Sequence, residues 1–226
     1  FDEIRFLMIA RLMYDKGYRQ FVDAAEIVKQ KYPDVHFELL GEICTEGPTI
    51  VPKEVLDEDI AKGYIEYLGE TNDVPSIVLR DGVVVVVASY YMEGMNRALM
   101  EACSMGRPII TTNMPGCKEM VDDSRTGYCI EPKSAESLAD ACIKFIKLSK
   151  EEKKTMGKAS YEKCKSRFNV KDVLTRYDRI IAELLKQEEP VEDIRRHVAE
   201  ISKALVSDKE KWEGLKEQRD IAMSQA

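Results

Sequence analysis

Two glutamates separated by seven residues, Glu93 and Glu101, are the side chains of this chain best placed to carry out chemistry. They follow a run without charged residues at positions 83–88, which is typical of a strand buried on both faces of a parallel sheet. Ligands of open α/β sheets bind at the carboxyl ends of such strands. We therefore expect a binding site here, with Glu93 in a loop before a helix and Glu101 about two turns into that helix.

The helix expected at residues 96–104 sets the distance between the two carboxylates. At ~1.5 Å per residue, its helical part separates them by roughly 9 Å. This spacing lets one carboxylate hold a sugar and the other a ribose, while free backbone N–H groups at the helix start receive the phosphates. The geometry suits a nucleotide-sugar. Taken singly, each glutamate is more simply interpreted as a loop or helix-surface carboxylate.

Two cations, Arg11 and Lys16, bracket the turn between the first expected strand and the first expected helix. Positive charges at a helix N-terminus oppose the macrodipole. Their placement becomes favourable if a diphosphate binds between them. The spacing by itself favours a solvated surface pair.

Five blocks of sequence resemble the family-four retaining glycosyltransferases. The segment from Glu93 to Glu101 resembles their Glu-x7-Glu motif, and the segment from Arg11 to Gly17 resembles their phosphate-binding Arg-Leu-x-x-x-Lys-Gly segment. The other three blocks are residues 67–69, 106–119 and 122–132. The blocks follow the family's order from about residue 4 to residue 185. The chain departs from the family at Ala88, where Pro is frequent, and at Asn96, where Pro or Ser is frequent.

The resemblance implies a role for each matching position. Glu93 would contact the donor sugar as the catalytic residue, Glu101 would bind the ribose hydroxyls, and Arg11 and Lys16 would bind the diphosphate. Backbone N–H groups would reach the phosphate from Gly94, Met95 and Asn96. The pocket would be lined by Arg97, Ala98 and Leu99. The wall beside the base would be formed by Thr71, Asn72 and Asp73.

The resemblance also implies an activity. A sugar would pass from a nucleoside diphosphate sugar, which we expect to be a UDP-sugar, to a glycan or lipid-linked acceptor in polysaccharide biosynthesis. The anomeric configuration would be retained, with no cofactor and no bound metal ion. Two alternatives stay open. One is a nucleotide-sugar-binding or assembly module without turnover, and the other is a sugar epimerase or a phosphorylase of the same architecture, of which a phosphorylase would need a lysine-bound pyridoxal cofactor.

The bulk properties restrict the class of partner and the location. The chain has 226 residues, 44% of them hydrophobic, and a formal charge of −7, which argues against binding to nucleic acid. No apolar run reaches the roughly 18 residues of a membrane span, and a signal peptide pattern is missing. We therefore expect a cytoplasmic location, with peripheral contact at the inner face of the membrane left open. Six scattered cysteines and two histidines suggest neither a disulfide framework nor a zinc site.

Alternating strand and helix patterns must position these residues. Strands are expected at 4–10, 35–40, 65–68, 83–88, 108–112 and 127–130. Helices are expected at 17–31, 55–62, 74–80, 96–104, from near 117, and at 134–147, 150–167 and 170–188. This alternation predicts an α/β fold with a Rossmann-like, doubly wound parallel sheet.

Two regions are expected in the chain. Residues 1–187 would form the nucleotide-sugar donor-binding domain, which the resemblance identifies as the C-terminal half of a GT-B fold. Residues 188–226 would form a helical tail, a hairpin with one apolar face that includes Ile194, Val198 and Ile201. The chain begins at Phe1, so we expect a fragment whose N-terminal acceptor domain is missing and which transfers no sugar alone.

Overall fold

The computed structural model describes residues 3–92, 94–185, 196, 198–201 and 203. The chain divides into two compact units, residues 1–165 and 166–226. The first unit contains the sheet and most of the predicted site residues. The domain boundary expected at residue 187 stays a prediction.

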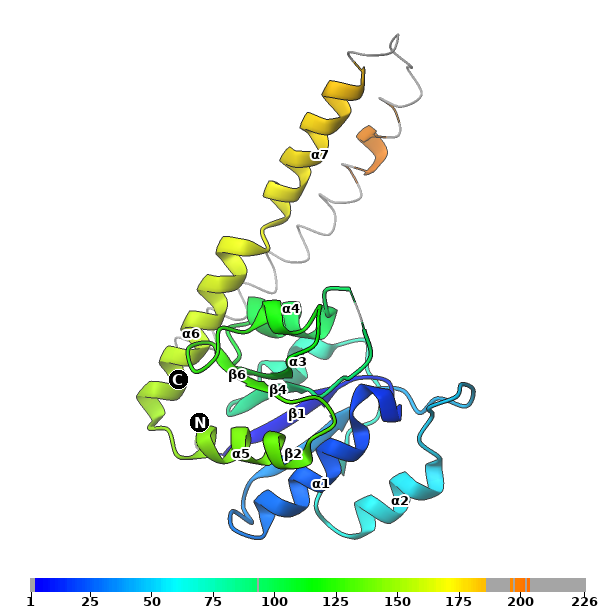
Figure 1. Ribbon diagram of the computed structural model, residues 1–226, viewed down its shortest axis with the longest axis vertical. Helices are drawn as coiled ribbons and strands as arrows, with labels where there is room; N and C mark the ends of the chain where they lie inside the picture. Colours follow the sequence, from blue (N-terminus) through cyan, green and yellow to red (C-terminus); the bar gives the residue numbers. More distant parts are fainter. Residues whose placement is uncertain (1–2, 93, 186–195, 197, 202, 204–226) are drawn as a thin grey trace. The chain divides into compact units, whose positions relative to one another are not determined.

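A six-stranded parallel sheet forms the centre of the first unit, with the strand order β3-β2-β1-β4-β5-β6 (Figure 1). The strands are β1 (Arg5–Ile9), β2 (His36–Leu40), β3 (Glu66–Tyr67), β4 (Val83–Val87), β5 (Ile109–Thr112) and β6 (Gly127–Ile130). The chain winds outward from β1 to β3 and then returns to place β4 on the other side of β1. The predicted doubly wound sheet is confirmed, and its switch point lies between β1 and β4, where ligands of such sheets bind.

Helices cover both faces of this sheet. The helices in the described part of the chain are α1 (Tyr18–Lys29), α2 (Lys53–Ala61), α3 (Val74–Val78), α4 (Arg97–Ser104), α5 (Ala135–Ile146), α6 (Lys150–Arg167) and, in the second unit, α7 (Val170–Leu185). Figure 1 shows α1 and α5 on one face, in contact with each other, and α3 and α4 on the opposite face. None of the described helices combines the length and apolar character needed to cross a membrane.

One predicted helix is wrong. The helix expected to start near Cys117 is only a short 3-10 turn, Lys118–Met120. Val121 already has an extended backbone, with φ −116° and ψ 138°, so the helical run ends there. The chain then enters the loop before β6, which leaves no room for further helical turns.

Aromatic and β-branched residues form the core that holds the sheet in register. All five valines of β4 are buried, as expected for a central strand covered on both faces. On the face covered by α1 and α5, the Phe6 ring lies 5.0 Å from that of Phe37 and 6.3 Å from that of Phe145, measured between centroids. Because successive side chains of a strand point to opposite faces, this packing specifies the register of each strand.

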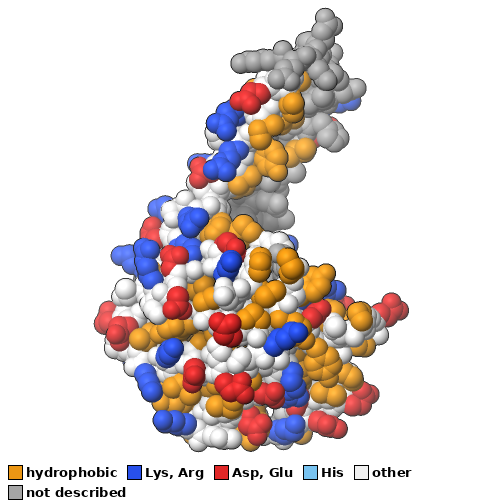
Figure 2. Space-filling model, in the orientation of Figure 1, with side chains coloured by type: hydrophobic (Ala, Val, Ile, Leu, Met, Phe, Trp, Pro, Cys, Tyr) orange, Lys and Arg blue, Asp and Glu red, His pale blue; other side chains and the backbone are white. Residues whose placement is uncertain are grey.

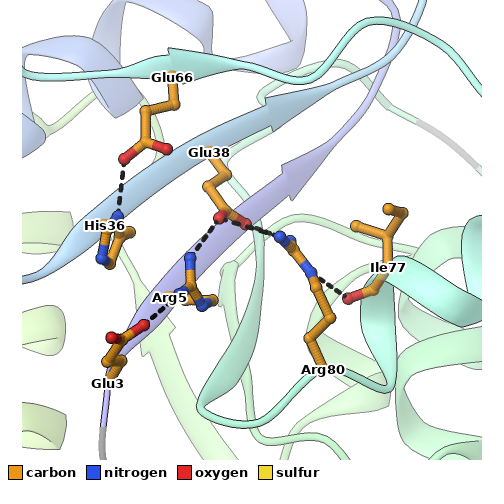
Figure 3. A network of polar contacts seen from close by, with 7 residues as sticks. All are labelled: Glu3, Arg5, His36, Glu38, Glu66, Ile77 and Arg80. Carbon is orange, nitrogen blue, oxygen red and sulfur yellow. Dashed lines mark hydrogen bonds and ion pairs between the residues drawn. The ribbon is translucent and has the colours of Figure 1, made fainter.

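A buried carboxylate on β2 is neutralised by two arginines (Figure 3). Glu38 is 1% exposed, and its Oε1 accepts hydrogen bonds from Arg5 Nη1 at 3.0 Å and Arg80 Nη1 at 3.2 Å. Arg80 Nε also donates to the Ile77 carbonyl at 3.0 Å. The network ties β1, β2 and the end of α3 together. None of its members was a predicted site residue, and we assign it to stability.

A second buried carboxylate anchors α2 to α1. Asp59 is 1% exposed and accepts hydrogen bonds from Tyr18 Oη, Arg19 Nη1 and Lys62 Nζ, each at 2.9 Å. Burial alone would raise the pKa of Asp59, but the hydrogen bonds from Lys62, Arg19 and Tyr18 outweigh burial and lower it below its ordinary value. The ionised carboxylate therefore stabilises the fold.

The second unit contains α7. Its apolar residues recur every three or four positions on one side, and Figure 2 shows hydrophobic side chains gathered along this helix. These residues are exposed: Val170, Val173, Tyr177, Ile180 and Leu184. The hairpin expected at residues 188–226 lies largely outside the described residues and stays a prediction.

Candidate functional site

The turn between β1 and α1 lies directly against the end of β4. Gly17 has φ +88°, and a Cβ at this position would lie 2.2 Å from the carbonyl oxygen of Ala88. Next to this contact, the Asp15 carbonyl accepts hydrogen bonds from Tyr90 N at 3.0 Å and from Ser89 Oγ at 3.3 Å. The segment with the two cations and the segment with the two glutamates therefore meet at the switch point of the sheet.

The structure places both predicted cations beside this junction. Lys16 ends the 3-10 turn Tyr14–Lys16, and its Nζ lies 5.2 Å from the centroid of the Tyr91 ring. Arg11 is exposed in the same connection after β1. Both cations follow the carboxyl end of β1, where a negatively charged ligand of the sheet is expected.

The start of α4 is fixed by Asn96. Its Oδ1 accepts a hydrogen bond from Leu99 N at 3.1 Å, so this side chain is the N-cap of the helix. Its own backbone N–H donates to the Gly116 carbonyl at 3.2 Å. In this structure the Asn96 amide is therefore bonded to Gly116, and its predicted contact with a phosphate stays a prediction. The same role for the exposed residues Gly94 and Met95 stays a prediction.

Glu101 is already paired within its own helix. Its Oε1 lies 2.8 Å from Arg97 Nε, one turn earlier, and the Arg97 side chain is 88% exposed whereas that of Glu101 is 22% exposed. A pair of this kind contributes only about 0.3–0.5 kcal/mol, so a ligand hydroxyl can displace it. Glu93 lies outside the described residues, and its role stays a prediction.

The remaining helix positions differ from one another. Ala98 is half-buried, and Leu99 is 0% exposed. The Leu99 side chain therefore packs in the core, and the predicted lining role of this residue stays a prediction. Arg97 reaches solvent, which is compatible with the predicted lining role.

The predicted wall beside the base is an exposed turn between β3 and α3. Thr71 Oγ1 accepts a hydrogen bond from Asp73 N at 3.0 Å, and Asp73 Oδ1 accepts one from Ser76 N at 3.3 Å, which caps α3. Asn72 is exposed between them. In the sheet order, β3 is separated from β1 by β2. Gly41 N donates to the Gly69 carbonyl at 2.8 Å, which joins the connection after β2 to the connection after β3. The contact of this turn with a base stays a prediction.

Sequence reasoning missed the residues that link the two motifs. Ser89 and Tyr90 bond to the Asp15 backbone, and Tyr91 lies beneath Lys16. Burial, followed by the nearby Asp15 carboxylate, raises the pKa of the Tyr90 hydroxyl, which keeps this group neutral. The sequence signal that could have identified Ser89, Tyr90 and Tyr91 is their position just after a buried strand.

A glutamate near the start of α4 has a local role. Glu119 Oε2 accepts a hydrogen bond from Gly116 N at 2.8 Å. The Gly116 carbonyl accepts from Asn96. Glu119 therefore supports the turn that contacts the start of α4.

The sheet order, the switch-point junction and the adjacent cations define a Rossmann-like nucleotide-binding class of domain. Residues 2–163 match the family described as "Glycosyl transferases group 1". The chain belongs to this family, which confirms the resemblance seen in the sequence blocks.

Similar proteins support the fold. The chain is 28% identical over 134 residues to a Campylobacter jejuni protein named "N,N'-diacetylbacillosaminyl-diphospho-undecaprenol alpha-1,3-N-acetylgalactosaminyltransferase", an alignment that covers 59% of this chain and 33% of that protein. Across three curated relatives, the chain spans 33% to 42% of the relative's length.

Two solved structures extend the comparison. The C-terminal domain of the glycosyl transferase group 1 protein LpcC from Francisella tularensis has a TM-score of 0.61 at 24% identity, over 74% of this chain and 87% of that domain. Anabaena Alr3699/HepE in complex with UDP-glucose has a TM-score of 0.65 at 21% identity, over 83% of this chain and 50% of that one. The expected fold, the C-terminal half of a GT-B glycosyltransferase, is confirmed.

Proposed function

We propose that the chain binds the donor of a retaining glycosyltransferase, which transfers a sugar from a UDP-sugar to a glycan or lipid-linked acceptor in polysaccharide biosynthesis. One observation carries this proposal: the close approach of Gly17 to Ala88 places Lys16 beside the loop that leads to the Glu-x7-Glu motif. Arg11, Lys16 and the segment that leads to α4 then meet at the switch point of the sheet.

The names of similar proteins support the choice of substrates. Anabaena HepE was solved with UDP-glucose, a UDP-sugar. The Campylobacter relative is named for transfer to a sugar on diphospho-undecaprenol, a lipid-linked acceptor. The donor combines a diphosphate with a sugar, and its diphosphate suits the cations Arg11 and Lys16.

The proposed chemistry assigns each charge a task. The departing diphosphate gains negative charge as the glycosidic bond breaks, and Arg11 and Lys16 stabilise that charge more in the transition state than in the ground state. Glu93 orients the donor sugar or stabilises positive charge on its ring. Glu101 exchanges its partner Arg97 for the ribose hydroxyls. The acceptor binds mainly to a further domain, so the chain alone binds donor and transfers nothing.

Calorimetric titration of the chain with UDP, GDP and ADP tests this proposal. We expect saturable binding of UDP that Glu101→Ala weakens. Glu183→Ala is the matched control, because Glu183 lies one turn after its partner Arg179 in α7, with 4.0 Å between Oε1 and the arginine Nε. Equal affinities for the parent chain and Glu101→Ala would contradict the ribose role. Absence of binding by all three nucleotides would contradict the donor site.

Catalysis needs a separate test. If Glu93 acts on the donor sugar, transfer by an assembly that contains this chain and the acceptor domain should be abolished by Glu93→Gln while UDP binding persists. Binding without any transfer would favour the module without turnover.

A further inference from the structure

Tyr91 holds an unusual position for a large aromatic residue. Its side chain is not packed in the core, since the residue is 56% exposed. Its ring instead lies beneath the ammonium of Lys16, with 5.2 Å between Nζ and the ring centroid. A cation within about 6 Å of an aromatic centroid is attracted by the negative face of the ring. The ring therefore has an electrostatic partner at the switch point.

The backbone around this pair is constrained on both sides. Tyr90 N, next to Tyr91, donates to the carbonyl of Asp15, next to Lys16, at 3.0 Å. Tyr91 N donates to Ser89 Oγ at 3.3 Å, and Ser89 Oγ donates to the same Asp15 carbonyl at 3.3 Å. The two main-chain segments therefore cannot drift apart without losing these hydrogen bonds.

We propose that Tyr91 is a positioning residue that holds the Lys16 ammonium ready for the donor diphosphate. A lysine side chain loses rotamer entropy when a ligand immobilises it, and contact with the ring reduces the freedom that ligand binding would otherwise have to remove. Unlike a carboxylate, the neutral ring attracts the ammonium without cancelling its charge. The inference rests on the proposed function, because it takes Lys16 as a ligand of the diphosphate.

The adjacent tyrosine offers a matched comparison. Lys133 Nζ lies 4.9 Å from the centroid of the Tyr90 ring, so the same type of contact occurs on the neighbouring residue. Lys133 belongs to the connection between β6 and α5 and is outside the Arg-Leu-x-x-x-Lys-Gly segment. Its removal should leave the binding of a diphosphate at Lys16 unchanged.

Titration of the full chain with UDP tests the inference. Tyr91→Leu should raise the Kd by about 2–5-fold, the range of an exposed cation–π contact. Tyr91→Phe keeps the ring and should bind like the parent, and Lys133→Met should do the same. In a Lys16→Met background, Tyr91→Leu should cause no further change, because the ring then has no ammonium to position.

The outcomes distinguish failure of the proposed diphosphate site from failure of the inference about Tyr91. If the parent fails to bind UDP, or if Lys16→Met binds as tightly as the parent, the diphosphate site fails and the inference fails with it. If Lys16→Met weakens binding but Tyr91→Leu does not, only the inference is overturned. An equal loss from Tyr91→Leu in both backgrounds would show that the ring contacts the nucleotide directly, which also overturns it.

Nuclear magnetic resonance checks the contact without a ligand. The Tyr91 ring should shift the ε-methylene protons of Lys16 upfield. The shift should persist in Tyr91→Phe and disappear in Tyr91→Leu. An unchanged shift in Tyr91→Leu would overturn the inference, and circular dichroism of each variant verifies that it is folded.

Discussion

Replacing Gly17 with alanine tests whether the turn between β1 and α1 must lie directly against β4. A Cβ at Gly17 would lie 2.2 Å from the Ala88 carbonyl oxygen, and the residue has φ +88°. The left-handed conformation costs an alanine about 1–2 kcal/mol, and an extra carbon in a packed site costs about 1–3 kcal/mol. We expect Gly17→Ala to lower the free energy of unfolding by about 2–5 kcal/mol.

Gly63→Ala distinguishes the cost of the left-handed conformation from the cost of the steric overlap. Gly63 has a similar φ of +79°, but among the described residues no heavy atom lies within 4 Å of where its Cβ would be. Gly63→Ala should therefore cost only the conformational part, about 1–2 kcal/mol. Urea unfolding followed by circular dichroism measures both variants, and an unchanged m-value verifies that the unfolding transition is comparable. The difference between the variants is the cost of the overlap with Ala88.

Ligand binding extends the same experiment to the site. A turn displaced by the new Cβ moves Lys16, so folded Gly17→Ala should bind UDP more weakly than Gly63→Ala. The reasoning is refuted if the two variants lose equal stability and bind UDP equally well. The turn could then move away from β4 at little cost, and the junction would not be rigid.

Three further predictions concern buried polar groups. The lowered pKa of Asp59 means that its ionised form stabilises the fold above about pH 4, and this contribution is lost as pH falls through the lowered pKa. Asp59→Asn should therefore reduce stability at pH 7 and make stability depend less on pH in the acid range. An unchanged pH dependence would contradict this. Glu38→Ala leaves two arginines without their shared carboxylate and should lower the free energy of unfolding in urea by about 2 kcal/mol. This is less than the roughly 3–5 kcal/mol of a fully buried pair, because the arginine side chains are 21% and 33% exposed. A loss smaller than that of an exposed ion pair would contradict the role of the network. Burial raises the pKa of the Cys142 thiol. A thiol reagent should therefore label half-buried Cys44 in the folded chain and Cys142 only after unfolding, and mass spectrometry measures the labelling of each cysteine. Labelling of Cys142 before unfolding would show that α5 opens locally.

Most of the fold was predictable because its signals are local. The valines of β4 form an uncharged β-branched run, and the helix α6 begins and ends at the predicted residues 150 and 167. The prediction failed near Cys117, where a helix was expected but the backbone becomes extended after one short turn. A short segment contains too few residues for periodicity to distinguish a helix from a turn.

The candidate site was predictable only in part. The two motifs, their charges and their positions after strands follow from the order of residue types. The capture of the Asn96 amide by Gly116 and the complete burial of Leu99 do not, because both depend on elements packed against α4. The binding roles predicted for Asn96 and Leu99 stay predictions.

The sequence by itself determined which segments carry cations and carboxylates and that each of them follows a strand of a parallel sheet. Only the tertiary structure decided that Gly17 contacts Ala88 and that Tyr91 lies beneath Lys16. Propensity and hydrophobic periodicity act over a few neighbouring residues. The contacts that assemble a site join residues far apart in the chain, and they form only when the whole sheet and its helices have packed.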